Sequence, residues 1–160
     1  MNVKKTIEEA VVFNCKKLSL PKPTVNYEPP TEFNTPTTKA GVDPNKANTI
    51  GVNISINWES PMEIWWVISH EMRHLWQVQT SYCKLVKQKY SNLQDYAKRP
   101  EEVDANAWGI YITAIKFQSR PLLENVYGQE VWNLIAMRFN EIIDEQQKGR
   151  NYDNHDVQIL

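Results

Sequence analysis

The chain has no long apolar run, almost no net charge and only two cysteines among its 160 residues. No stretch approaches the ~20 consecutive apolar residues that a membrane-spanning helix needs. A formal net charge of −1 gives no electrostatic basis for binding nucleic acid or an anionic membrane. Met1–Lys5 is followed by Glu8 and Glu9 rather than by an apolar segment, so we expect no secretory signal and a cytoplasmic location.

Several motifs that define common enzyme classes are also missing. Cys15 and Cys83 are isolated and form no CxxC pair, which excludes a zinc ribbon and favours reduced, partly buried thiols; a disulfide stays open. The sequence contains no Walker loop, dinucleotide fingerprint, nucleophile elbow or internal repeat. Nucleotide-binding and serine-hydrolase functions therefore have no motif to support them.

The composition is that of one ordinary globular domain, with 41% hydrophobic and 23% charged residues. We expect a single domain over residues 1–149 and a polar C-terminal tail over 150–160. Six Trp and seven Tyr predict a core built from large rings.

The first part of the chain predicts a helix followed by a small sheet. Apolar residues at helical spacing predict a helix over 3–18. Five prolines between 21 and 38 indicate an extended segment, with a short strand at 24–27. Residues 40–43 and 49–57 read as two strands joined by a turn, and we expect a small antiparallel sheet.

The strand at 49–57 alternates in character. Its apolar positions, expected on one buried face, are Ile50, Val52, Ile54 and Ile56. Its polar face or free edge could pair with an extended peptide, and an ordinary half-solvated strand explains the pattern equally well.

A capped helix is predicted from Pro61 to about Gln79. Ser60 suits the N-cap, Pro61 the first helical position, and Glu63 completes a capping box. An apolar arc is formed by Ile64, Trp65, Ile68, Met72 and Leu75. His70, His74 and Glu63 form a polar stripe beside this arc, at the expected rim of the core.

This helix carries the run His70-Glu71-Met72-Arg73-His74, an H-E-x-x-H motif. Residues four apart lie on one helix face, so His70 and His74 can bind one metal ion, and zinc accepts such imidazole ligands. Glu71 lies about 100° away and is placed to act as general base for a water molecule. Three fixed letters in five arise by chance in on the order of one chain in a few hundred, so the motif needs support from the rest of the sequence.

A third ligand is expected from a later helix that starts at Pro100. Residues 80–99 are polar and rich in tyrosine, and we interpret them as a connector over the site. On the later helix Glu102 and Asn106 border the apolar face formed by Val103, Ala107, Ile110, Ala114 and Phe117. Glu102 is therefore the preferred ligand, with Glu101 and then Asp104 as alternatives, although acidic residues at a helix start need no metal to explain them. Asn106 could hold a ligating histidine by its other ring nitrogen.

The remaining residues predict supporting helices. A short helical turn is expected at 121–126 and a helix at 129–147. His155 in the tail is read as a bystander.

The strand and capped helix at 49–74, with Glu102-Val103-Asp104-Ala105-Asn106-Ala107, resemble the gluzincin-type zinc peptidases. Within these the chain looks closest to the compact ImmA/IrrE-like and prophage-type metallopeptidases. The resemblance implies an α+β, mainly helical zincin-like domain, with the small sheet before the motif helix. It also implies a Glu ligand on the later helix and a regulatory or phage-related protein as substrate. The chain lacks the further histidine and the leucine-methionine-proline ending found in some relatives.

The sequence thus predicts a zinc-dependent peptidase in which His70, His74 and Glu102 bind Zn²⁺, Asn106 supports a ligand and Glu71 is the general base. Its partner would be a protein or peptide substrate. Tyr82, Tyr90, Tyr96 and Arg99 are the candidates for stabilising the oxyanion, and the sequence does not choose among them. Two alternatives stay open: an inactive zincin-like binding module with a structural metal, and a metal-free helical interaction domain.

Overall fold

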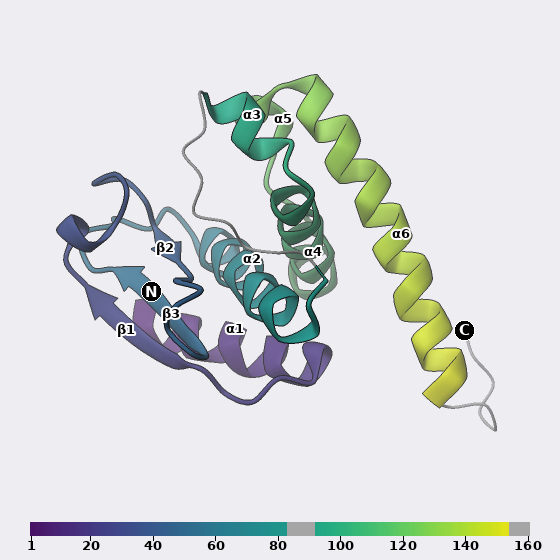
Figure 1. The fold of residues 1–160 in the computed structure, drawn as a ribbon, viewed down its shortest axis with the longest axis horizontal. Helices are drawn as coiled ribbons and strands as arrows, with labels where there is room; N and C mark the ends of the chain where they lie inside the picture. The colour runs from purple at the N-terminus through teal and green to yellow at the C-terminus, as the bar shows by residue number, and fades with distance from the viewer. Residues whose placement is uncertain (83–91, 154–160) are drawn as a thin grey trace.

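The computed structural model describes residues 1–82 and 92–153, with side chains up to residue 149. The chain folds into helices around a small sheet, which confirms the α+β class (Figure 1). In chain order the elements are α1 (Val3–Leu18), β1 (Thr24–Glu28), a short 3-10 turn (Pro30–Glu32), β2 (Ala40–Gly41), β3 (Thr49–Asn53), α2 (Pro61–Thr80), α3 (Leu93–Ala97), α4 (Pro100–Phe117), α5 (Glu124–Tyr127) and α6 (Gln129–Asp153).

The sheet is mixed, so the expectation of an antiparallel sheet is wrong. Its strand order is β1-β3-β2, with β1 parallel and β2 antiparallel to β3. An alternating pattern shows which face of a strand is buried but carries no information on the direction of its neighbour. β3 is consequently the central strand, and its edge is not free as the sequence allowed. The two edge strands are β1 and β2.

β3 is also shorter than predicted, because it ends at Asn53. Ile50 and Val52 are buried as expected, whereas Ile54 is 62% exposed. The buried Asn53 amide donates to the carbonyls of Pro36 and Thr38, at 3.0 and 2.9 Å, and its oxygen accepts from the Ser55 amide. The Asn53 side chain therefore lies at the end of β3 and holds the segment that precedes β2 in place.

The long helix α2 begins where its sequence predicts. Ser60 Oγ accepts the Glu63 amide at 3.2 Å, and Pro61 follows at the first helical position. The Glu63 carboxylate accepts the amide of Glu59 at 2.7 Å, one residue before the N-cap, and also pairs with Lys39. Glu63 is therefore used in capping and in an ion pair.

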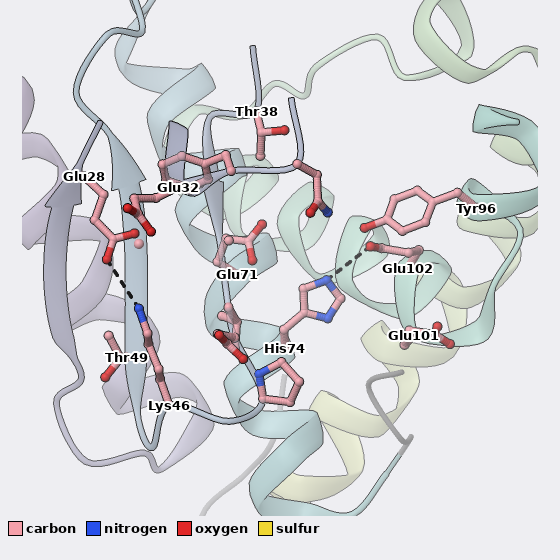
Figure 2. Close-up of a pocket in the computed structure, with 18 of the residues that line it drawn as sticks. Glu28, Glu32, Thr38, Lys46, Thr49, Glu71, His74, Tyr96, Glu101 and Glu102 are labelled. Atoms are coloured by element: carbon pink, nitrogen blue, oxygen red, sulfur yellow. Dashed lines mark hydrogen bonds and ion pairs between the residues drawn. The ribbon is translucent and has the colours of Figure 1, made fainter. Parts of the chain in front are cut away.

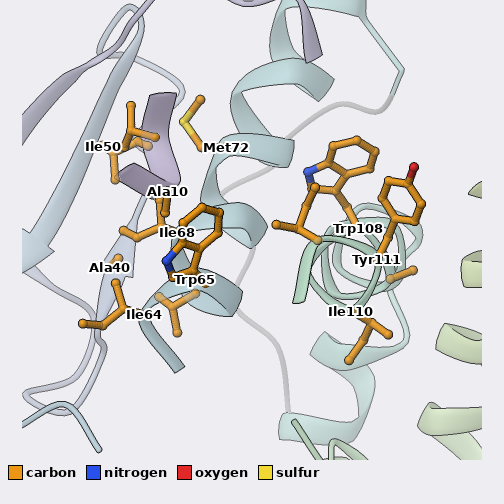
Figure 3. Close-up of a cluster of buried hydrophobic side chains, with 14 of the residues drawn as sticks. Ala10, Ala40, Ile50, Ile64, Trp65, Ile68, Met72, Trp108, Ile110 and Tyr111 are labelled. Carbon is orange, nitrogen blue, oxygen red and sulfur yellow. The ribbon is translucent and has the colours of Figure 1, made fainter. Parts of the chain in front are cut away.

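The four long helices pack side by side in the order α1, α2, α4 and α6 (Figure 1). α1 and the sheet lie on one side of α2, α4 packs on the other side, and α6 lies along the far side of α4. Figure 3 shows how Ile64, Trp65 and Ile68 of α2 meet Ala10 of α1 and Ile50 of β3. The predicted apolar arc of α2 is the centre of the core.

The helix α4 is buried on almost every side, which differs from the single apolar face expected. Trp108 and Ile112, which lie outside the apolar face predicted for this helix, are both fully buried, and Asp104 is 1% exposed. The reason is that α4 lies between α2 and α6, and sequence periodicity did not reveal the second neighbour.

The C-terminal helix extends beyond the predicted boundary. α5 and α6 are separated at Gly128, as expected. α6 then continues to Asp153, so the predicted tail at 150–160 begins inside a helix; residues 154–160 lie outside the described residues. Among the helices of the described ranges, none has the length and apolar character needed to cross a membrane.

Candidate metal centre

The structure brings together the three side chains that the sequence assigns as metal ligands. His70 and His74 project from neighbouring turns of α2, and Glu102 projects from the first turn of α4. His70 Nε2 lies 3.0 Å from His74 Nε2, and Glu102 Oε2 lies 3.0 Å from the former and 3.1 Å from the latter. The three ligand atoms thus form a nearly equilateral triangle, and these residues form the candidate metal centre.

The size of this triangle suits a zinc ion. Zinc–nitrogen bonds of about 2.0–2.1 Å at tetrahedral angles separate two ligand atoms by about 3.4 Å. The observed separations of 3.0–3.1 Å come within a few tenths of an ångström of that value. Two imidazoles and one carboxylate are also a donor set that catalytic zinc uses, with a fourth position left for water or substrate.

The second ring nitrogen of each histidine meets a side-chain amide oxygen. His70 Nδ1 lies 2.8 Å from Asn106 Oδ1, and His74 Nδ1 lies 2.8 Å from Gln77 Oε1. These nitrogens must donate to the amide oxygens, so a neutral ring presents its Nε2 lone pair to the centre. Asn106 lies where the sequence predicts it. Gln77 was not predicted, although its position three residues after His74 on the same helix face was an available signal.

Three electron-pair donors at this spacing require a positive charge between them. Burial alone would lower the pKa of His74, but the charge and hydrogen bond of Glu102 outweigh burial and raise it to about 9. Burial alone would likewise raise the pKa of Glu102, and the two histidines hold it well below its ordinary value. In the metal-free protein a proton on His74 supplies this charge; a divalent cation could replace it.

Glu71 lies near His74 and Glu102 without belonging to the group of three ligand side chains (Figure 2). Its side chain is 8% exposed and lines the same cavity as His74 and Glu102. Burial raises its pKa, while the neighbouring histidines act in the opposite direction. Its location agrees with the one predicted for a general base.

The other two candidate ligands have different roles. Asp104 binds Arg73 at 2.8 Å and Arg138 at 2.8 Å, and these three buried residues form what we call the Asp104 cluster. Burial would raise the pKa of Asp104, but its hydrogen bond to Arg73 lowers it. Glu101 is one of the residues that line the cavity, and its backbone carbonyl accepts from Gln77. Neither belongs to the group that can hold one ion.

The centre opens into a cavity of about 280 Å³ between the sheet and α4. Glu28 of β1 lies on the sheet side and Tyr96 on the opposite side (Figure 2), and Gly41 of β2 and Arg99 also line the cavity. Gly51 lies close to the sheet side of the cavity, and a Cβ atom there would lie 3.0 Å from Glu28 Oε2, at the end of a flexible side chain. The cavity is large enough for part of a peptide but does not enclose a large molecule.

Three of the four residues predicted as candidates to stabilise the oxyanion are described by the structure, and they lie in different places. Tyr96 and Arg99 line the cavity, whereas Tyr82 packs at a tilt against Trp76, with ring centroids 5.2 Å apart. Tyr90 lies outside the described residues. Tyr127 is a neighbour of the site that the sequence did not predict: it is hydrogen-bonded to Asn106, and burial raises its pKa to about 12. Nothing local marks it, because α5 approaches the site only through the tertiary fold.

Comparison of the chain with protein-family models, with curated proteins and with solved structures gave no match.

Proposed function

We propose that the protein is a zinc-dependent peptidase with a zincin-like fold, as the H-E-x-x-H motif suggests. One observation carries the proposal: His70, His74 and Glu102 converge within 3.0–3.1 Å of one another with Glu71 beside them. A purely structural metal site has no use for a base at this position, so Glu71 favours an enzyme. The resemblance carried by the sequence makes a regulatory or phage-related protein the expected substrate class.

His70, His74 and Glu102 would hold the ion. A bound zinc would act as a Lewis acid, polarising the peptide carbonyl and acidifying water. Glu71 would accept a proton from the attacking water and return it to the leaving nitrogen. Tyr96 and Arg99 line the same cavity and are the candidates to donate to the developing oxyanion.

The sheet supports binding of an extended peptide. β2 is an edge strand, and within residues 1–82 and 92–153 no strand pairs with its outer side. Ala40, Gly41 and Val42 also line the cavity, so a peptide added beside β2 would pass the centre. This replaces the edge that the sequence indicated for the strand at 49–57.

The test compares metal content and hydrolysis in three variants. Wild-type protein should hold about one zinc per chain and cleave a quenched fluorescent peptide library. Glu71→Gln should keep zinc and lose cleavage, whereas His74→Ala should lose both. Glu9→Gln, an exposed glutamate on α1, is the matched control and should behave as wild type. A Glu71→Gln protein that cleaves at the normal rate would overturn the mechanism.

The inactive binding module is the competing function, since an open strand edge can also hold a partner without cutting it. Removal of metal by a chelator distinguishes the two. Loss of fold in a protein that never shows turnover favours the module, while reversible loss of turnover in a folded protein favours the peptidase.

A further inference from the structure

We propose that Gln77 positions the imidazole of His74 for metal binding, and that the Asp104 cluster holds Gln77 in the required orientation. The proposal rests on the metal centre of the proposed function. It adds a chain of contacts from the centre to the distant helix α6.

The orientation of the Gln77 amide is determined by its surroundings. Gln77 Nε2 donates to Asp104 Oδ2 at 2.8 Å and to the Glu101 carbonyl at 2.9 Å. Both partners are acceptors only, so the nitrogen must face them and the oxygen must face His74. The side chain is fully buried, which makes the reversed amide costly, because two acceptors would then face an oxygen.

This orientation of the Gln77 amide selects one tautomer of the His74 imidazole. Gln77 Oε1 lies 2.8 Å from His74 Nδ1 and can only accept, so Nδ1 carries a proton. The Nε2 lone pair is then directed at Glu102 Oε2 and His70 Nε2, where the ion would lie. Gln77 touches none of the proposed reacting atoms and acts through His74, so it is a positioning residue.

Within the Asp104 cluster, Arg73 and Arg138 hold the Asp104 carboxylate that binds Gln77. Arg73 donates to both carboxylate oxygens of Asp104, at 2.8 and 3.1 Å. Arg138 of α6 donates to Asp104 Oδ1 at 2.8 Å. All three residues are at most 9% exposed, so the carboxylate cannot turn without leaving buried charges unpaired.

Arg138 is itself anchored along α6. Its guanidinium donates to Glu141 at 2.9 Å and to Glu145 at 2.8 Å. The contacts therefore run from α6 through Asp104 and Gln77 to His74. A change at Arg138, which contacts no ligand atom, should weaken metal binding.

The direct test is the protonation of the His74 ring in zinc-loaded wild-type protein, read by long-range proton–nitrogen correlation spectra. We expect a proton on Nδ1 and a metal-bound Nε2. A metal-bound Nδ1 or a proton on Nε2 overturns the proposal without any variant.

Variants test the same series of contacts through their zinc affinity, which is measured in competition with a chromophoric chelator. Gln77→Leu, similar in size but without an amide, should bind zinc about 10- to 100-fold more weakly, the usual effect of losing such a partner. Arg138→Met should weaken binding about tenfold. Arg120→Met is the matched control, because Arg120, like Arg138, pairs with a glutamate and lies over an aromatic ring. It should keep wild-type affinity.

These outcomes separate the proposal from the proposed function, because affinity and ring protonation need no turnover. Wild-type zinc affinity in a folded Gln77→Leu protein overturns the positioning role, even if Glu71→Gln is inactive. Normal cleavage by Glu71→Gln overturns the catalytic proposal alone. If Gln77→Leu does not fold, equal zinc affinity in Arg138→Met and Arg120→Met overturns the contact chain.

Discussion

Replacing Asn14 should destabilise the protein more than its place on an apolar helix face suggests. Asn14 of α1 is fully buried. Its amide nitrogen donates to Ser69 Oγ at 2.8 Å and to the Ala10 carbonyl at 2.9 Å. Its oxygen accepts Trp108 Nε1 at 2.8 Å. One side chain therefore joins α1, α2 and α4, next to the residue that precedes His70.

The magnitude follows from the groups left behind in Asn14→Leu. Leucine fills much of the space, so the principal loss is polar. The buried indole N–H of Trp108 loses its acceptor, which costs about 1–3 kcal/mol. The Ser69 hydroxyl can rotate, and the added apolar contact contributes about 1 kcal/mol in the opposite direction. We expect a net loss of about 1 kcal/mol in the free energy of unfolding, or about 2–4 °C in Tm.

The assay is urea unfolding followed by far-ultraviolet circular dichroism. Asn140→Leu, on the exposed side of α6, is the control and should change stability by less than about 0.5 kcal/mol. A double-mutant cycle with Trp108→Phe isolates the hydrogen bond, since Trp108→Phe should cost less once Asn14 is leucine. An Asn14→Leu protein as stable as wild type, or a cycle with no coupling energy, would refute this reasoning.

Three further predictions concern packing, protons and metal. Gly109→Ala would place a Cβ 2.5 Å from Trp66 Cδ1, so it should destabilise by about 1–2 kcal/mol despite the better helix propensity of alanine; Gly149→Ala, with nothing within 4 Å, should not. In metal-free protein the pKa of His74 is raised from 6.5 to about 9. The stability that protonated His74 contributes is therefore fully present below pH 6.5 and is lost as the pH rises through 9. His74→Gln should remove this dependence in pH-dependent thermal melts, and a pH-independent wild-type Tm over that range would contradict it. Zinc at 100 times its Kd should stabilise wild type by about 2.7 kcal/mol and leave His74→Ala unchanged, as melting with and without a chelator would show.

Local patterns are enough to place the helices that carry the site. The spacing of His70 and His74 sets their common face, and Ser60 and Pro61 set the start of α2, because these effects act within one or two helical turns. Periodicity also ranks Glu102 above Asp104, since position around α4 decides which carboxylate can face the two histidines. Short-range patterns therefore pair His70 with His74 and favour Glu102, while the packing of α2 against α4 brings the three side chains together.

Contacts between distant segments are decided by tertiary packing alone. Asp104 meets Arg138 across 34 residues, and no repeat or spacing links the two positions. The parallel pairing of β1 with β3 is equally hidden, because alternation reports a buried face and not a neighbour's direction. α4 packs against both α2 and α6, so its burial on every side and the orientation of Gln77 depend on which helices surround them, a property of the assembled fold rather than of any local stretch.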